Sequence, residues 1–361
     1  MKKVLFILSR DFGEISLATI FARNQSFKRV YAIPEYRMPI FDEPAEAIYP
    51  YTSITDLPKI IEQEKPDLIS LNSGYLIIDG NLASRSEYSE FRRYLAKSDI
   101  PLLTTDPFVR IFDYFPDSKF EINGRPIEKV QEEIKYLSSR FSKIPHVYGF
   151  PFITDKVEAY TFYNDKYFTE EKADGDSETK RWLLVLAELD TLLLLDRHGK
   201  NFVPILEQRL MEICGNPKNM VNFVLPYKLG QALQANVRNL ENLYITSFVP
   251  LGYFEKILRN SDIVLYWNVF SNSILLCYCY NIPLLFFDKG HIANLTEYTF
   301  DHISKYIYKG GKPEFIDFES PIDSDLDILL NNNFSYEKRS VILDNYKRLE
   351  SPSNIVERLC Q

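Results

Sequence analysis

A polar turn in the C-terminal half of the chain carries residue types that can bind an anion. The turn, Asn268 to Ser273, follows the apolar run Asp262 to Trp267 and opens another apolar run that we predict to be a helix. Backbone N–H groups and the positive end of the helix dipole meet at such a helix start, so the turn suits a diphosphate. Ser271 or Ser273 would alternatively only cap the helix, as serine often does. The polar side chains of the turn are Asn268, Ser271, Asn272 and Ser273.

Basic residues lie in two other segments of the same half. The cluster Arg197-His198-Gly199-Lys200 precedes a predicted helix, and Asp288-Lys289-Gly290-His291 follows the last clear strand. Basic side chains in these places could contact phosphate or a donor sugar. The alternatives are a solvated turn for the first cluster and a structural role for the loop histidine. The candidate donor contacts from these segments are Arg197, His198, Lys200, Lys289 and His291.

The elements that must position these residues follow from alternating patterns along the chain. Val4 to Leu8 is a continuous apolar run, which is typical of a parallel strand covered by helices on both faces. Similar runs alternate with helical stretches as far as Thr104, and the alternation resumes from Arg181. This order predicts an α/β protein with doubly wound parallel sheets, whose ligand sites lie beyond the carboxyl ends of the strands.

The predicted elements have the following bounds. The strands are Val4–Leu8, Arg29–Ile33, Asp67–Leu71, Pro101–Thr104, Trp182–Ala187, Val221–Leu225, Leu243–Ile245, Asp262–Trp267 and Leu284–Phe287. The helices are Ile15–Phe21, Ile54–Glu64, Glu87–Ala96, Glu128–Phe141, Val203–Cys214, Gly252–Arg259 and Ser273–Tyr280. The run Leu192 to Leu195 fits a strand or a helix, and the charged stretch Thr169 to Glu178 fits a linker.

Length and composition restrict the class of protein. A chain of 361 residues exceeds one ordinary domain, and 45% hydrophobic with 25% charged residues is the balance of a folded globular protein. The apolar runs are shorter than the roughly 20 residues of a membrane span, and Arg10 and Asp11 end the first run too early for a signal peptide. The four cysteines show no paired metal-ligand spacing, which favours packing roles in a reducing cytosol. A net charge of -8 disfavours nucleic acid as a partner.

The stretch Asn242 to His291 resembles the C-terminal domain of GT-B glycosyltransferases and the related UDP-N-acetylglucosamine 2-epimerases. The resemblance lies in the order of Asn242–Pro250, a short helix, Leu258–Val264, the polar turn with its helix, and Asn281–Phe286. Ser351–Leu359 also looks like the last helix of that family, and Lys2–Glu14 looks like its first strand and acceptor loop.

The resemblance implies roles for individual residues. Phe248 and Val249 would border the nucleotide base, and the side chains of Ser271 to Ser273 would hold the diphosphate. Many family members carry a glutamate for the ribose in the following helix, whereas Ile274 to Tyr280 contains no acid. This departure leaves open donors other than UDP-sugars, including CMP-sugars, and also an inactive site.

A glycosyl transfer by inversion requires a group that takes the proton from the acceptor hydroxyl. Asp11 and Glu14 lie just past the carboxyl end of the first predicted strand, but their three-residue spacing also fits a reciprocal helix cap. Asp106 is the second candidate base, with a plain turn residue ahead of Pro107 as its alternative. The candidate acceptor contacts are Asn72, Ser73, Gly74 and Tyr75.

The predicted architecture is therefore two Rossmann-like, doubly wound parallel-sheet domains that face a cleft, as in the GT-B fold. We expect an acceptor-side domain at residues 1–165, a linker or mobile loop at 166–180 and a nucleotide-sugar-binding domain at 181–340. We expect residues 341–361 to form a C-terminal helix that can pack back on the first domain.

The predicted function is a cytoplasmic, metal-independent glycosyltransferase that moves a sugar from a nucleotide-sugar to a saccharide or other hydroxyl acceptor in polysaccharide or glycoconjugate synthesis. The nucleotide-sugar is a co-substrate, so no cofactor is expected, and peripheral contact with a membrane stays open. Asp323-Ser-Asp325 resembles a metal-binding motif but fits a helix start. The alternatives are a sugar-nucleotide epimerase, a non-catalytic GT-B-like binding protein and, against the acidic charge balance, a phage-type DNA glucosyltransferase.

Overall fold

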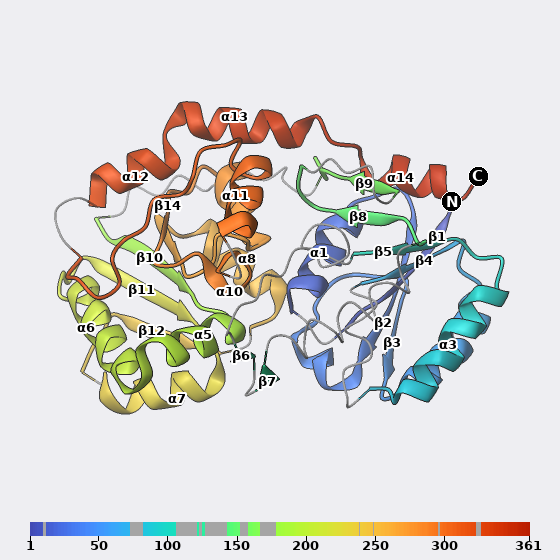
Figure 1. Cartoon of the computed structure of the whole chain (residues 1–361), viewed down its shortest axis with the longest axis horizontal. Coiled ribbons are helices and arrows are strands. Elements are labelled where there is room, and N and C mark those ends of the chain that lie inside the picture. Colours follow the sequence, from blue (N-terminus) through green and yellow to red (C-terminus); the bar gives the residue numbers. More distant parts are fainter. Residues whose placement is uncertain are drawn as a thin grey trace. The chain divides into compact units, whose positions relative to one another are not determined.

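The computed structural model divides into two compact units. Unit 1 comprises Met1–Phe115, Glu128–Thr169 and Asn345–Gln361, and unit 2 comprises Pro116–Ile127 and Glu170–Asp344. Each unit has its own parallel sheet (Figure 1). The structure describes residues 1–9, 12–72, 82–105, 121–122, 125–126, 143–151, 158–166, 178–237, 239–247, 249–294, 297–322 and 326–361.

The sheet of unit 1 has seven parallel strands in the order β3-β2-β1-β4-β5-β8-β9. Because β1 lies between β2 and β4, the strand order reverses beside it, as at the switch point of a doubly wound sheet. The strands are β1 (Lys3–Ile7), β2 (Lys28–Pro34), β3 (Ala47–Tyr51), β4 (Leu68–Leu71), β5 (Leu102–Thr104), β8 (His146–Tyr148) and β9 (Ala159–Thr161).

Alternate residues of β1 face opposite layers of unit 1. Leu5 belongs to a buried cluster with Leu57 of α2 and Phe91 of α3. Phe6 points the other way, and its ring centroid lies 6.1 Å from that of Phe21 in α1. The two-residue period of a strand thus explains why the whole run is apolar. The helical segments are α1 (Phe12–Ala22), η1 (Glu35–Ile40), η2 (Ile54–Asp56), α2 (Leu57–Glu64) and α3 (Arg85–Lys97).

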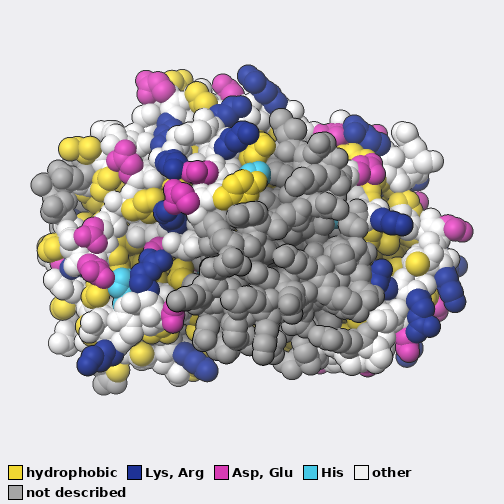
Figure 2. Space-filling model, in the orientation of Figure 1, with side chains coloured by type: hydrophobic (Ala, Val, Ile, Leu, Met, Phe, Trp, Pro, Cys, Tyr) yellow, Lys and Arg dark blue, Asp and Glu magenta, His cyan; other side chains and the backbone are white. Residues whose placement is uncertain are grey.

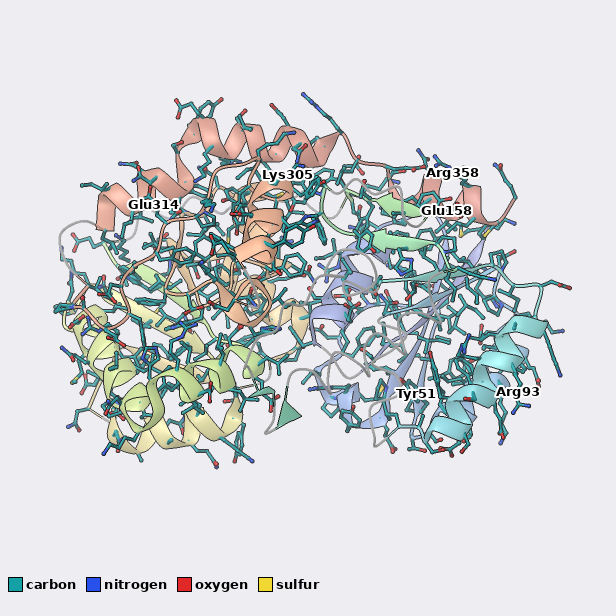
Figure 3. All side chains as sticks on the ribbon, in the orientation of Figure 1. Tyr51, Arg93, Glu158, Lys305, Glu314 and Arg358 are labelled. Atoms are coloured by element: carbon teal, nitrogen blue, oxygen red, sulfur yellow. The ribbon has the colours of Figure 1, made fainter. Side chains whose placement is uncertain are left out.

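Helix α14 (Pro352–Leu359) belongs to unit 1, although unit 2 lies between it and the rest of that unit in the sequence. The backbone N–H of Glu350 donates to the Thr161 carbonyl of β9 at 3.2 Å. The guanidinium of Arg358 lies 5.4 Å from the centroid of the Tyr160 ring, and Figure 3 shows Arg358 on α14 beside this strand. These contacts attach the C-terminal segment to the β9 edge of the sheet.

The sheet of unit 2 has five parallel strands in the order β12-β11-β10-β13-β14. Here the order reverses beside β10, which lies between β11 and β13. The strands are β10 (Lys180–Val185), β11 (Asn219–Val224), β12 (Leu243–Thr246), β13 (Ile263–Tyr266) and β14 (Leu284–Phe286). A separate antiparallel pair joins β6 (Glu121–Ile122) and β7 (Arg125–Pro126).

Helices cover the sheet of unit 2. On one face Trp182 and Leu184 form a buried cluster with Leu206 and Leu210 of α6, whereas Tyr266 faces α9. The helices are α5 (Glu188–His198), η4 (Gly199–Asn201), α6 (Phe202–Cys214), α7 (Tyr227–Asn236), α8 (Leu251–Arg259), α9 (Ser273–Cys279), α10 (Gly290–Ala293), α11 (Glu297–Tyr306), α12 (Leu326–Phe334) and α13 (Tyr336–Lys347).

The predicted α/β architecture with two doubly wound parallel sheets is confirmed. All nine predicted strands are present, and the ambiguous run Leu192 to Leu195 is part of helix α5. Strands β3 and β6 to β9 and helices α7 and α10 to α12 were not among the predicted elements, and the region of the single helix predicted at 341–361 contains the end of α13 and the whole of α14. Residues 167–177, the predicted helix Glu128–Phe141 and Asp323–Asp325 lie outside the described residues.

The surface mixes charges of both signs. On the face shown in Figure 2, Lys and Arg side chains are interspersed with Asp and Glu side chains over the described residues. In the described part of the chain, no helix has both the length and the apolar character needed to cross a bilayer.

Candidate functional site

Three chain segments meet at the carboxyl edge of the unit 2 sheet. They are the first turn of α5 after β10, the turn 267–272 after β13, and the loop 287–289 with α10 after β14. Since β10 and β13 flank the point where the strand order reverses, this edge is where a doubly wound sheet binds its ligand.

Asp190, in the first turn of α5, connects the three segments. Its side chain is only 2% exposed, and Oδ1 lies 2.7 Å from His291 Nδ1. The same oxygen accepts the backbone N–H of His291 at 2.8 Å, and Asn268 Nδ2 donates to Oδ2 at 3.2 Å. A buried carboxylate is stable only with such donors around it.

Asp288 is a second buried carboxylate at this edge. It forms an ion pair with Arg197, accepts the backbone N–H of Gly290 at 3.0 Å and accepts a hydrogen bond from Asn294. The Arg197 side chain is 41% exposed, whereas that of Asp288 is 9% exposed. The pair therefore joins the last turn of α5 to the start of α10.

Gly290 lets the β13 and β14 segments approach each other closely. Its φ of +86° is a conformation that L-residues with a side chain rarely adopt. A Cβ at this position would lie 2.5 Å from Cγ of Asn268. Only glycine fits here without displacing the Asn268 side chain that contacts Asp190.

The two serines of the polar turn are bonded to each other instead of capping α9. Tyr266 Oη donates to Ser273 Oγ at 2.9 Å, and Ser273 Oγ lies 2.9 Å from Ser271 Oγ. The N-cap residue of α9 is Asn272, and no side chain makes a capping hydrogen bond there. Ser273 Oγ has two acceptor lone pairs, so it can accept from Tyr266 and either donate to Ser271 or accept from it.

The basic residues predicted to contact the donor divide into two groups. Lys289 lies at the edge with His291, where its Nζ is 3.1 Å from Glu297 and 4.3 Å from the centroid of the Phe300 ring. His198 packs instead with Phe318, and its Nδ1 lies 3.0 Å from Glu319.

The remaining donor candidates lie apart from these contacts. Lys200 is exposed on η4, and Val249 is buried ahead of α8. Phe248 lies outside the described residues. The contacts of His198 with Phe318 and Glu319 place its ring outside the group formed around Asp190 and Asp288.

The carboxyl edge of the unit 1 sheet contains Glu14. This residue is 8% exposed in α1 and accepts a hydrogen bond from the hydroxyl of Thr105, which follows β5. Asn72, which follows β4, is 1% exposed; it donates its backbone N–H to the Ile7 carbonyl of β1 and accepts from Ser70. Four other candidates, Asp11, Ser73, Gly74 and Tyr75, lie outside the described residues, as does Asp106.

Sequence reasoning did not select Asp190, Asp288 or Thr105 as site residues. Asp190 follows β10 just as Glu14 follows β1, so the search for polar residues beyond each strand end could have found it. It was overlooked because the adjacent leucine run, Leu192 to Leu195, fits a strand as well as a helix. Asp288 lies beside Lys289 in a motif that was selected for its basic residues.

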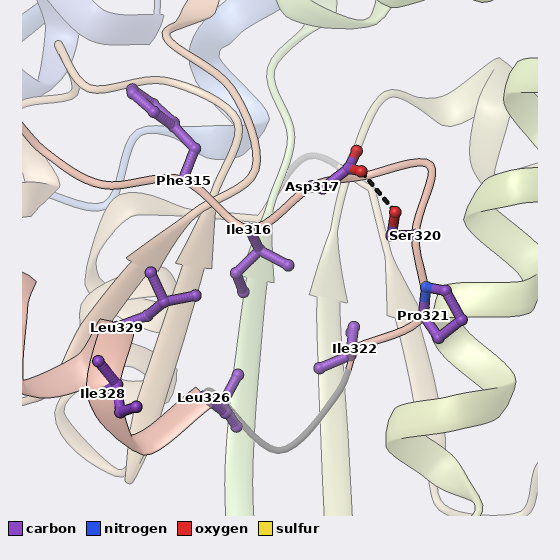
Figure 4. Close-up of a pocket in the computed structure, with 9 residues that line it drawn as sticks. All are labelled: Phe315, Ile316, Asp317, Ser320, Pro321, Ile322, Leu326, Ile328 and Leu329. Atoms are coloured by element: carbon purple, nitrogen blue, oxygen red, sulfur yellow. Dashed lines mark hydrogen bonds between the residues drawn. The ribbon is translucent and has the colours of Figure 1, made fainter.

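A cavity of about 280 Å³ in unit 2 lies apart from these residues, between the loop 315–322 and α12. Figure 4 shows a mostly aliphatic lining, with Ser320 bonded to Asp317. None of the predicted site residues lines it. Among the residues that the structure describes, no three His, Cys, Asp or Glu side chains are grouped closely enough to hold a metal ion.

Comparison with solved structures defines the fold class. The spinosyn rhamnosyltransferase SpnG, complexed with thymidine diphosphate, aligns with a TM-score of 0.54 and 11% identity over 100% of both chains. The glycotransferase of kitacinnamycin aligns with a TM-score of 0.56 and 11% identity over 99% of this chain and 98% of that one. A Listeria monocytogenes protein described as a UDP-N-acetylglucosamine 2-epimerase aligns with a TM-score of 0.50 and 11% identity over 99% and 94%.

No family model and no curated protein sequence matches the chain. The full-length structural likeness, together with two Rossmann-like sheets, shows that the chain has the GT-B fold. The resemblance inferred from the sequence is confirmed at the level of the fold.

Proposed function

We propose that the chain is a glycosyltransferase that moves a sugar from a nucleotide-sugar donor to a saccharide or other hydroxyl acceptor, in polysaccharide or glycoconjugate synthesis. The observation that carries this proposal is the convergence of Asp190, Asn268 and His291 at the switch point of the unit 2 sheet. The full-length likeness to SpnG, whose structure contains thymidine diphosphate, supports a nucleoside diphosphate as the ligand of this edge.

The proposed donor contacts are hydrogen-bond donors and cations of unit 2. Ser271, Lys289 and His291 would bind the diphosphate, with Arg197 beside them, and Phe248 and Val249 would border the base. These groups would stabilise the leaving phosphate without a metal or another cofactor. The diphosphate would have to share these cations with their acid partners, since Lys289 pairs with Glu297 and Arg197 pairs with Asp288.

The proposed acceptor contacts belong to unit 1. Glu14 or Asp11 would take the proton from the acceptor hydroxyl, with Asp106 as the next candidate. The segment Asn72 to Tyr75 would bind the acceptor. Glu14 is the one of these three acids in the described residues, and its buried carboxylate accepts from Thr105.

Thermal-shift measurement with UDP, thymidine diphosphate, GDP and CMP tests the donor site. A ligand at 100 times its Kd stabilises the folded protein by about 2.7 kcal/mol, so one nucleotide should raise the melting temperature. Ser271→Ala should reduce that increase. The matched control Ser335→Ala removes a serine that accepts from Lys338 N–H elsewhere in unit 2, and it should leave the increase intact. Absence of stabilisation by every nucleotide at millimolar concentration would contradict the proposal.

A sugar-nucleotide epimerase is the second candidate. The observation that favours it is a carboxylate in contact with a histidine, Asp190 with His291, because proton abstraction from a sugar needs such groups. Proton NMR of UDP-N-acetylglucosamine incubated with the protein and no acceptor separates the two functions. New sugar signals would support the epimerase, whereas turnover that requires an acceptor saccharide would support the transferase.

A further inference from the structure

We propose that Asp190 is a positioning residue that fixes the His291 imidazole with its proton on Nδ1, so that His291 exchanges protons with a bound phosphate through Nε2. The part of this inference that concerns phosphate rests on the proposed function. The tautomer of the ring does not depend on that function and can be measured separately.

The geometry of the contact defines which nitrogen carries the proton. Oδ1 of Asp190 lies 2.7 Å from Nδ1 of His291. An ionised carboxylate only accepts hydrogen bonds, so Nδ1 must be the donor in this pair. The remaining ring nitrogen, Nε2, is then the position at which the ring gains or loses a proton.

The same carboxylate also fixes the orientation of the ring. Its Oδ1 accepts the backbone N–H of His291 at 2.8 Å, so the main chain and the ring of one residue are bound to one oxygen. Asn268 donates to Oδ2 at 3.2 Å and thereby restricts rotation of the carboxylate. The Asp190 side chain is 2% exposed and the His291 side chain 22% exposed, so the supporting carboxylate is buried while the histidine side chain is partly exposed.

The arrangement suits a general acid for the leaving group. In the imidazolium form, Nε2–H gives its proton to the phosphate oxygen released when the bond to the sugar breaks. The ring becomes neutral and keeps its other proton on Nδ1, next to Asp190. It regains a proton at Nε2 from water before the next turnover. A carboxylate in this place stabilises the charged ring and prevents the wrong tautomer.

A purely structural role for Asp190 would involve only the backbone N–H of His291, at the start of α10. The two roles differ in what they predict for the ring. Structural support alone leaves the imidazole in either tautomer, whereas positioning requires the Nδ1–H form. The matched control is Asp288, the other buried carboxylate of this edge, whose contacts are with Arg197, Gly290 and Asn294.

Two-bond 1H–15N correlation spectra of the full chain labelled with 15N-histidine test the inference, because the chain has only four histidines and His291→Gln assigns the signal. We expect neutral His291 to be the Nδ1–H tautomer in the wild-type protein and in Asp288→Asn, and to change to the Nε2–H tautomer in Asp190→Leu. An Nε2–H tautomer in the wild-type protein would overturn the proposal, even if the leucine variant failed to fold.

Thymidine diphosphate and UDP, added to the same labelled protein, test the phosphate contact. If either nucleotide binds, the Nε2 signal of His291 should move, and Asp190→Asn should lower kcat by roughly 10²-fold with unchanged donor affinity. Binding without any change at Nε2 would overturn the role of His291. If neither nucleotide binds while the ring has the expected tautomer, the proposed function fails and the role of Asp190 in fixing the ring stands.

Discussion

The carboxyl edges of the two sheets share a strand order but differ in their polar residues. In unit 1, the described residues beyond β1, β4 and β5 include one buried carboxylate, Glu14, which accepts a hydrogen bond from the hydroxyl of Thr105. In unit 2, Asp190 and Asp288 connect three segments through a histidine, an arginine and backbone N–H groups. The common topology therefore fixes where a site can lie, while the residues after each strand decide which polar groups the site offers.

The comparison also separates the kinds of ligand that the two edges suit. The cations of the unit 2 edge already have acid partners, so a ligand there gains from fixed geometry more than from excess positive charge. The unit 1 edge offers a carboxylate, which would repel an anion and suits a neutral hydroxyl group. We therefore expect substitutions at the two edges to affect different measurements.

The largest effect should come from Glu14→Gln in unit 1. Loss of a general base lowers turnover by roughly 10²- to 10⁴-fold, and donor affinity should be preserved because the proposed donor contacts lie in unit 2. The measurement is the rate of nucleotide release with the donor identified by thermal shift. The control Glu87→Gln alters a carboxylate that serves as a helix cap on α3 and should retain activity. Full activity of Glu14→Gln would transfer the role of base to Asp11 or Asp106.

The next largest effect should come from Gly290→Ala in unit 2. Gly310 has the same φ of +86°, but a Cβ there would meet no atom within 4 Å. Both alanine variants therefore incur backbone strain of about 1–3 kcal/mol, and only Gly290→Ala also displaces Asn268. Chemical denaturation should show a larger loss of stability for Gly290→Ala than for Gly310→Ala. Equal losses would mean that the close approach of Gly290 to Asn268 does not affect stability.

A smaller effect is expected for Asp288→Ala. The substitution leaves the Gly290 N–H without its acceptor and removes one of the two acceptors of the Asn294 amide, which also donates to the Gly290 carbonyl. Arg197 can be hydrated because it is 41% exposed. We expect a loss of about 2 kcal/mol of folding free energy, together with weaker nucleotide binding. Isothermal titration calorimetry and denaturation measure the two quantities. If Asp288→Ala were as stable as the wild-type protein, the contacts of Asp288 would contribute nothing to the stability of this edge.

The smallest effect should be that of Ser351→Ala, which alters unit 1 away from its carboxyl edge. Ser351 Oγ accepts the backbone N–H of Asn354 at 3.3 Å and caps α14. Removal of the cap should cost about 1 kcal/mol in stability and leave nucleotide affinity and turnover unchanged. Reduced turnover in this variant at a temperature well below its melting temperature would mean that the packing of α14 affects catalysis as well as stability.

The sequence predicted the buried strands well because strands covered on both faces have continuous apolar runs. Strand β3 was missed for a physical reason: Ala47 to Tyr51 includes Pro50, and only Tyr51 in it is buried, so it lacks that run. The run Leu192 to Leu195 could not be assigned from four residues. In the helix, Leu193 and Leu194 face the core while Leu192 and Leu195 are about 40% exposed, a distribution that appears only with the fold.

The candidate site could be predicted in part. The polar turn Asn268 to Ser273, Lys289 and His291 could be chosen as candidates because they follow predicted strands, at the edge where a doubly wound sheet binds ligands. The partners of these residues could not be predicted, since Asp190 and His291 are 101 residues apart and meet only when β10 and β14 join one sheet. The separation of His198 from this group likewise depends on its packing with Phe318.

The attachment of α14 to unit 1 has a consequence for the order of folding during synthesis. A ribosome makes the β9 edge of unit 1 first, then the long segment Glu170–Asp344 of unit 2, and only afterwards the segment Asn345–Gln361 that contacts this edge. Most of unit 2 is the single segment Glu170–Asp344, which is complete before the last helix of unit 1 is made. In a growing chain, the carbonyl of Thr161 and the ring of Tyr160 therefore lack their partners Glu350 and Arg358 until the segment Glu170–Asp344 has been made.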